Sequence, residues 1–103
     1  MRTLEFGVNG QKLSKENDFS GVVCGTEGYL KCGFRFFGND WAKCKIIIVF
    51  KAGPEEHAVA LGNDRTCVIP REVTDRTSFK VWVIGVRDNY RITTNKILVK
   101  QEG

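Results

Sequence analysis

The chain has 103 residues, of which 42% are hydrophobic and 27% are charged, so it is long enough to bury a hydrophobic core as one domain over residues 1–103. Its longest uninterrupted apolar run, residues 46–50, falls far short of the ~20 apolar residues that a membrane-spanning helix needs. The first residues lack the apolar block of a signal peptide, so we expect synthesis in a cytosol and no insertion into a membrane.

The formal net charge is +4, from 16 Lys and Arg against 12 Asp and Glu, and the basic residues are spread along the chain. The longest basic cluster, Lys43-Cys44-Lys45, is shorter than the runs of about five to eight residues that are typical of nucleic-acid-binding segments. On a β-strand, Lys43 and Lys45 would share one solvated face. Nucleic acid is therefore not an expected partner.

The N-terminal third predicts two strands. Three residues alternate with polar or small ones and predict the first strand: Leu4, Phe6 and Val8. Asn9 and Gly10 predict a tight turn after this strand. A polar loop around residues 14–18 should follow, and residues 19–24 predict a second strand, which breaks at residues 25–28.

The clearest predicted strand comes next. Four residues point to one side of it: Leu30, Cys32, Phe34 and Phe36. Lys31 and Arg35 point to the other side, as expected for a sheet with one dry face. The segment 38–40 ends this strand, and residues 45–51 predict another. Because the interior positions of residues 45–51 are all apolar, we expect that strand near the middle of a sheet, with both faces covered.

Two shorter strands are predicted over residues 57–61, with Val59 and Leu61 on one face, and over residues 66–69. The second of these must end at Pro70, because proline has no amide proton to donate to a sheet. Proline at a first helical position predicts a single helical turn, which begins at Pro70 and ends by Asp75.

A closing hairpin is predicted from residues 79–86 and 90–99, which meet at the turn 87–89. Five residues of its first strand divide between two faces, with Val81 and Val83 on one and Trp82, Ile84 and Val86 on the other. Both faces therefore need cover. On the returning strand, Ile92 has the opposite parity to Ile97 and Val99, which predicts a bulge or bend near Thr94 and Asn95. We expect Lys96 and Lys100 to guard this edge against self-association.

Seven to nine short strands at regular spacing, eleven glycines and no helix longer than a turn or two predict an all-β protein. The pattern is typical of an immunoglobulin-like antiparallel β-sandwich made of two sheets. The N-terminal to C-terminal order of the strands does not by itself indicate a reaction, a ligand or a partner.

The four cysteines do not suggest a metal site. They are spread along the chain without any Cys-x-x-Cys pair: Cys24, Cys32, Cys44 and Cys67. Structural zinc sites usually contain at least one such closely spaced pair. Cys32 lies in a predicted strand among apolar residues, which favours a small buried side chain. Pairing in an oxidising environment stays open, with three possible connectivities.

Catalytic residues are not indicated either. The only histidine, His57, follows Pro54-Glu55-Glu56 and is expected in an exposed loop without an orienting partner, whereas a catalytic cysteine needs a base within hydrogen-bond reach. Glu55 and Glu56 would face opposite sides of a strand. The glycine-containing segment 25–28 lacks the helix of a phosphate-binding loop. We therefore expect no enzyme activity, no cofactor and no metal ligand.

The order of several motifs resembles a known family. These motifs are Phe34-Arg35-Phe36 with Trp41, then Cys67-Val68-Ile69-Pro70-Arg71-Glu72-Val73, then Phe79-Lys80-Val81 with Gly85, and Arg91-Ile92-Thr93-Thr94-Asn95. From about Phe34 to Val99, the chain resembles short immunoglobulin-like β-sandwich domains of tail and baseplate proteins from phages and prophages of Gram-positive bacteria. The first thirty residues show no such resemblance.

The resemblance implies a structural role in a virion, reached after synthesis in the bacterial cytoplasm. Partners would be other phage structural proteins, or further copies of the chain in an oligomer. Phe34, Phe36 and Trp41 would then lie in the core, and Cys67 would be a buried strand residue. The segment from Pro70 to Val73 would cross from one sheet to the other.

Phe37 marks a candidate contact surface, because its parity places it with Arg35 and Lys31, away from the core. An outward aromatic side chain favours a contact between subunits. The alternative is a carbohydrate-binding or adhesive module that contacts a glycan on the host surface. Four aromatic residues are candidate stacking platforms for a sugar in that case: Tyr29, Phe37, Trp82 and Tyr90.

Overall fold

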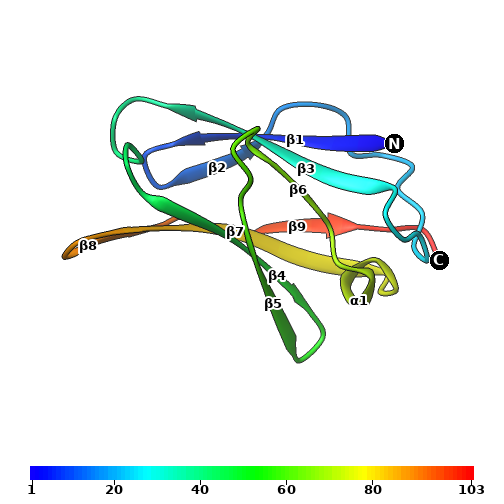
Figure 1. The fold of residues 1–103 in the computed structure, drawn as a ribbon. Coiled ribbons are helices and arrows are strands. Elements are labelled where there is room, and N and C mark those ends of the chain that lie inside the picture. The colour runs from blue at the N-terminus through cyan, green and yellow to red at the C-terminus, as the bar shows by residue number, and fades with distance from the viewer.

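The computed structural model describes residues 1–103 as two β-sheets packed face to face, with one short helix at an end of the sandwich (Figure 1). The first sheet has the strand order β2 (Lys12–Lys15), β1 (Arg2–Asn9), β3 (Leu30–Phe37) and β6 (Thr66–Val68). The second has the order β5 (Glu55–Ala60), β4 (Lys45–Ala52), β7 (Ser78–Arg87) and β8 (Tyr90–Thr93), and β9 (Ile97–Lys100) also pairs with β7. Helix α1 (Arg71–Thr74) is a single turn. The prediction of an all-β sandwich of seven to nine strands with at most one helical turn is confirmed.

Some strand neighbours agree with the immunoglobulin pattern. β3 lies beside β6, and β7 lies between β4 and β8, which are the neighbours of strands B and E and of strands C, F and G in that fold. However, β1 pairs with β3 in parallel, from Arg2 opposite Leu30 to Asn9 opposite Phe37. Strand β2 returns the chain toward the start of β1, so β3 begins at the same end as β1. The first sheet is therefore mixed, although all other strand pairs are antiparallel.

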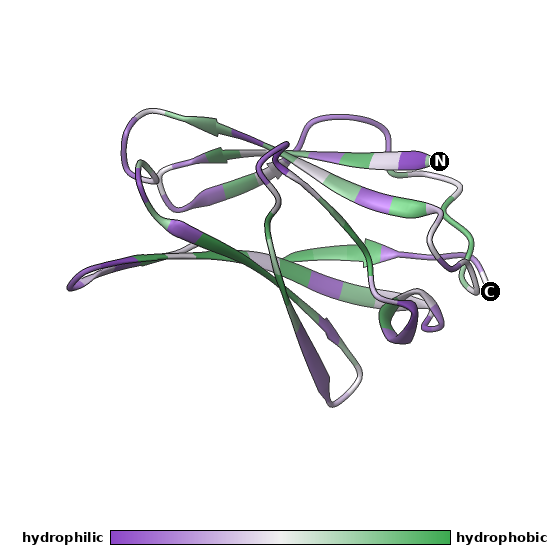
Figure 2. Cartoon of the chain, in the orientation of Figure 1, coloured by the Kyte–Doolittle hydropathy of each residue, from purple (hydrophilic) through white to green (hydrophobic).

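One hydrophobic core fills the space between the sheets. Leu4, Phe6 and Val8 point into it from β1, as their alternation predicts, and each is at most 1% exposed. The Phe6 and Phe34 rings stack with centres 5.0 Å apart. The hydropathy colouring in Figure 2 shows apolar residues alternating with polar ones along β3, whereas β4 and β7 lack strongly polar residues through their middles. Period-two alternation thus assigns one face of each sheet to the core.

The motif residues that the resemblance places in the core are largely buried. Phe34 and Trp41 are buried, and Phe36 is half-buried and packs against the core. Cys67 is 8% exposed on β6. The segment that includes Pro70 leads from β6 in the first sheet to β7 in the second, by way of α1.

The strand predicted over residues 19–24 is wrong. Residues 16–29 form a loop, which contains only an isolated bridge between Val23 and Glu102. The Asp18 carboxylate accepts hydrogen bonds from the amide and the hydroxyl of Ser20, both at 2.8 Å, and stabilises a turn. Gly21 follows with φ of 70°, a conformation that breaks an extended strand.

The first turn also differs from the prediction. Gly10 and Gln11 are its central residues, one position later than expected, because Gly10 takes the left-handed conformation with φ of 59°. Asn9 then pairs with Lys12, and β2 occupies positions that include part of the predicted polar loop. His57 is likewise in a strand, β5, and not in an exposed loop.

The slip in the closing hairpin is confirmed. Ile84 pairs with Thr93 and Val81 with Ile97, so β7 advances three residues while the returning chain advances four. The extra residue lies in the break between β8 and β9, where the Thr94 hydroxyl accepts a hydrogen bond from the Val83 amide at 3.0 Å. This slip brings Ile92, Ile97 and Val99 to the same face.

The chain has no helix that is long and apolar enough to span a membrane.

Candidate functional site

The outer face of the first sheet carries the three residues of the predicted contact surface. Lys31, Arg35 and Phe37 share the face of β3 that is opposite the core, with Gly33 between Lys31 and Arg35. Lys31 is half-buried and Arg35 exposed, and 38% of Phe37 is exposed. The Arg35 guanidinium lies 5.3 Å from the centre of the Phe37 ring. The arginine thus covers part of the aromatic surface that a ligand would need.

Lys31 and Arg35 also line a trough of about 600 Å³ on this face, which does not include Phe37. Gly33 leaves its floor without a side chain. The other outward residues come from β1, from β6 and from the loops before β3 and β6: Thr3, Glu5, Glu16, Asp64, Arg65 and Thr66. The Glu16 carboxylate lies close to where a β-carbon on Gly7 would be, so a larger residue at position 7 would displace the glutamate side chain. Sequence reasoning missed these wall residues, because two of the four segments that supply them are loops.

Charges in the trough balance. Three cations, Lys31, Arg35 and Arg65, are set among three carboxylates, and no ion pair within 4.0 Å joins any of them. Hydrogen bonds from the hydroxyl and the amide of Thr66, helped by the charge of Lys31, lower the pKa of Asp64 below its ordinary value. A polar trough without net charge suits an uncharged or zwitterionic ligand.

The outer face of the second sheet has a different character. We use this name for the residues of β4, β5, β7, β8 and β9 that point away from the core, together with Lys96. Its centre is apolar, with Val49 directly opposite Trp82 and Ile47 directly opposite Ile84. Two further apolar residues, Val86 and Leu98, are 40% and 44% exposed.

Only part of this apolar centre is covered. Trp82 is 6% exposed, because Val49 packs beside it and the Lys96 ammonium group lies 4.5 Å from the centre of its ring. The expected cover on both faces of β7 is therefore wrong for Val86, since the sandwich has only two layers and no element lies over it (Figure 1). The parity of Trp82, Ile84 and Val86 predicts this shared face, but not whether another layer covers it.

The candidate stacking platforms have different surroundings. Trp82 is too deeply buried to stack on a sugar, and the hydroxyl of Tyr90 donates a hydrogen bond to the Asp40 carbonyl while Arg87 lies over its ring. Tyr29 is 50% exposed, at the end of the loop before β3. Neither Trp82 nor Tyr90 therefore offers a free aromatic face.

The histidine and the two buried cysteines lie on different sheets. His57 is half-buried opposite Phe50, with its Nε2 3.4 Å from the Glu55 carboxylate. Cys32 and Cys67 are free thiols that lie directly opposite each other on β3 and β6. Burial raises the pKa of Cys32, and a hydrogen bond from Cys32 lowers the pKa of Cys67. No three side chains of the types that bind metals lie close enough together to hold an ion.

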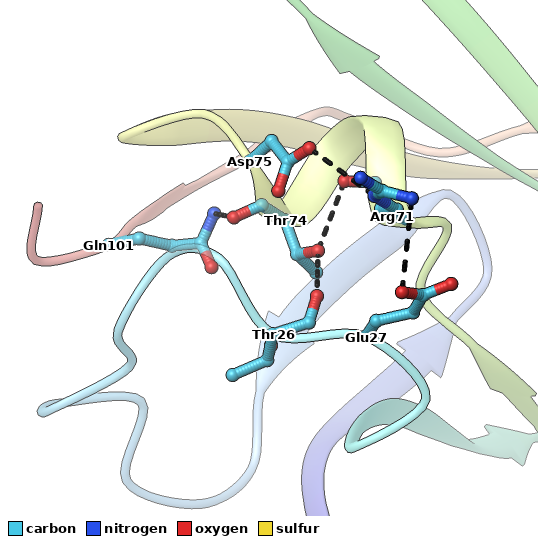
Figure 3. Close-up of polar contacts among 6 residues, drawn as sticks. All are labelled: Thr26, Glu27, Arg71, Thr74, Asp75 and Gln101. Carbon is cyan, nitrogen blue, oxygen red and sulfur yellow. Dashed lines mark hydrogen bonds and ion pairs between the residues drawn. The ribbon is translucent and has the colours of Figure 1, made fainter.

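A polar cluster surrounds helix α1 (Figure 3). The Thr74 hydroxyl, which is buried, contacts the carbonyl oxygens of Thr26 and Arg71. Arg71 lies between Glu27 and Asp75, at 4.0 and 3.8 Å. These contacts join the loop before β3 to α1. Because Thr74 is 1% exposed, its hydroxyl is not accessible to a substrate, and the cluster is a structural clamp.

Comparisons of the chain with protein-family models, with curated proteins and with solved structures found no match. The resemblance to phage tail domains therefore rests on the order of the sequence motifs alone.

Proposed function

We propose that the chain is a non-enzymatic structural module that works by protein–protein contact in the tail or baseplate of a phage or prophage virion. The virion assignment rests on the resemblance of the segment from Phe34 to Val99 to phage tail and baseplate domains. The contact role rests on the exposed apolar residues on the outer face of the second sheet. Synthesis in the bacterial cytoplasm would precede incorporation into the particle.

The observation that carries the contact role is the apolar centre of that face. Val86 is 40% exposed and lies two residues from the half-buried Ile84 on β7, and Leu98 is 44% exposed opposite Lys80, so both belong to the same sheet surface. Contiguous apolar surface with a polar rim is typical of protein interaction sites. A second layer of protein over this face would bury it, much as the first sheet buries the inner face.

The test is incorporation into particles. The prophage of the encoding bacterium would be induced, and the particles purified and analysed by mass spectrometry. We expect the chain in particles together with tail proteins, and we expect Val86→Asp to exclude the chain from them, because the substitution replaces an apolar side chain of the contact with a carboxylate that would lose its water on burial. The matched variant Arg35→Ala, on the opposite sheet, should still be incorporated.

The isolated Val86→Asp protein should lose no more than about 1 kcal/mol of unfolding free energy in urea, because Val86 is partly exposed on the surface. Particles that lack the unchanged chain would overturn the virion assignment. Equal incorporation of Val86→Asp and the unchanged chain would overturn the role of this face.

The trough supports a second candidate function, a carbohydrate-binding or adhesive module for a host glycan. Its volume of about 600 Å³ and its charged and hydroxyl-bearing walls suit a ligand with many hydroxyl groups. A glycan array tests this function. Binding that is lost in Arg35→Ala and kept in Val86→Asp would support it, and the absence of binding to any glycan would exclude it.

A further inference from the structure

The outer face of the second sheet concentrates the positive charge of the protein. Six cations point to this face: Lys45, Lys51, Lys80, Arg91, Lys96 and Lys100. Glu56, opposite Lys51, is the one carboxylate that the register turns to it. The face therefore carries a net charge of +5, more than the +4 of the whole chain, whereas the trough on the other sheet is neutral.

These cations have no carboxylate partners within the chain. None of them takes part in an ion pair within 4.0 Å, although the chain has twelve carboxylates. Lys51 and Lys80 are directly opposite each other on β4 and β7. Like charges directly opposite across two strands are destabilising, so the isolated fold gains nothing from this arrangement. An acidic partner would offset the repulsion.

From this charge distribution we propose that the outer face of the second sheet binds an acidic surface on a different protein. Apolar residues at the centre of that partner surface would cover Val86 and Leu98. The inference rests on the contact role proposed above and names the chemistry of the partner. Lysines around an apolar centre would form the rim of the interface. Complementary charge in such a rim orients the two proteins and speeds association.

A second copy of the chain does not fit the same face. A two-fold symmetric contact places identical surfaces against each other, so it would bring two sets of six cations together. Like-charge contacts of this kind oppose association. The neutral trough on the opposite sheet offers no acidic surface for a head-to-tail contact either.

Nucleic acid and lipid fit less well than a protein. Proteins that bind single strands stack bases on exposed aromatic rings, whereas Trp82 is 6% exposed and Lys96 covers its ring. Val86 and Leu98 lie on the strands of a sheet and not on a protruding loop or an amphipathic helix that could enter a bilayer. The apolar centre would gain little against the phosphates of a duplex.

The first experiment measures binding of an acidic peptide that alternates Glu and Leu, by fluorescence anisotropy of the labelled peptide. We expect binding that weakens as salt rises from about 50 to about 500 mM, because salt screens the attraction. The double variant Lys51→Glu/Lys80→Glu should bind about tenfold more weakly. The matched double variant Lys31→Glu/Arg35→Glu, on the other sheet, should change affinity by less than about twofold.

Three outcomes would overturn the inference. An oligothymidylate or phosphatidylglycerol vesicles bound more tightly than the peptide would indicate another class of partner. Equal losses in the two double variants would show that only overall charge matters. A dimer in sedimentation that Lys51→Glu/Lys80→Glu converts to monomer would show that a second copy covers the face.

Cross-linking in purified particles gives a direct test. A carbodiimide joins a lysine ammonium group to a carboxylate that contacts it, so we expect Lys51 or Lys80 linked to Asp or Glu of another protein. Links only within the chain would overturn the inference. If Val86→Asp is excluded from particles while Lys51→Glu/Lys80→Glu is incorporated, the contact role stands and the acidic partner does not. If both variants are incorporated, the contact role itself fails.

Discussion

The indole ring of Trp41 packs directly on Gly85: a β-carbon added to Gly85 would lie 2.7 Å from two of the ring carbons. Trp41 also donates a hydrogen bond from Nε1 to the Gly10 carbonyl at 2.8 Å. A single residue between β3 and β4 therefore contacts β7 in one sheet and the first turn of the other. This contact gives a physical reason for Trp41 and Gly85 to occur together among the sequence motifs.

Gly85→Ala should destabilise the protein. The added methyl group would force the Trp41 ring out of place, and overpacking of this kind costs about 1–3 kcal/mol of unfolding free energy. Urea denaturation measures the change. Val86→Ala, at the next position of β7, is the control and should cost less than about 1 kcal/mol, because Val86 is 40% exposed. Equal costs for the two variants would contradict the packing argument.

The free energy of unfolding should fall when Thr94 loses its hydroxyl group and should change little when Thr94 loses its methyl group. In Thr94→Val, the buried Val83 amide loses the acceptor that lies 3.0 Å away. An unpaired buried amide costs about 1–3 kcal/mol. Thr94→Ser keeps the acceptor and should cost less than about 1 kcal/mol. Amide hydrogen exchange at Val83 should speed up in the valine variant alone, and the same rate in both variants would contradict this role.

The four thiols should fall into two classes of reactivity. Cys24 and Cys44 are half-buried, whereas Cys32 and Cys67 are 0% and 8% exposed. Burial also raises the pKa of Cys32 and so disfavours the reactive thiolate. Titration with a chromogenic aromatic disulfide should therefore give two fast thiols in the native protein and four after unfolding in guanidinium.

The double variant Cys24→Ser/Cys44→Ser should lose the fast phase, and Cys32→Ser/Cys67→Ser should keep it. Four fast thiols in the native protein would contradict the burial of the pair on β3 and β6. Fewer than four thiols after unfolding would show that a disulfide has formed.

Two exposed carboxylates make stability depend on acid pH. Hydrogen bonds from the amide and hydroxyl of Ser20 lower the pKa of Asp18 below 3.8, and those from the hydroxyl and amide of Thr66 lower the pKa of Asp64 below 3.8. Because each pKa is lower in the folded state, the ionised forms stabilise the fold fully above pH 3.8. This contribution is lost as pH falls below 3.8 through the folded pKa values.

The urea midpoint should therefore fall between about pH 4 and about pH 2, and Asp18→Asn/Asp64→Asn should show a smaller fall. Asparagine keeps a carbonyl oxygen as acceptor but does not titrate. The same acid dependence in the double variant and the unchanged protein would assign the loss to other groups.

Alternation predicted the strands that have one buried face. The side chains at positions 4, 6 and 8 of β1 enter the core, and the same period recurs in β3 and β7. The opposite parities of Ile92 and Ile97 located the slip near Thr94, because only one extra residue lets both reach the same face. Such predictions succeed because burial repeats with the two-residue period of a strand.

The prediction failed where local polar contacts decide the conformation. Residues 19–24 include enough apolar side chains to suggest a strand, yet the Asp18 turn and the left-handed Gly21 direct the chain into a loop. The Glu16 wall of the trough depends on the path of this loop. The alternate positions of Lys31, Arg35 and Phe37 on one strand predicted that they share a face, whereas the sequence did not predict the trough on that face.

The all-β class, the face of each long strand and the alignment of the closing hairpin follow from the order of the residues, because these features depend on the spacing of apolar residues along one segment. Tertiary structure decided which strands are neighbours. It placed β1 parallel to β3, set Trp41 on Gly85, and gathered on one uncovered sheet six cations that are scattered between positions 45 and 100. The physical reason is that sheet pairing joins residues far apart in the chain, so a charge pattern that looks diffuse in sequence can be concentrated in space.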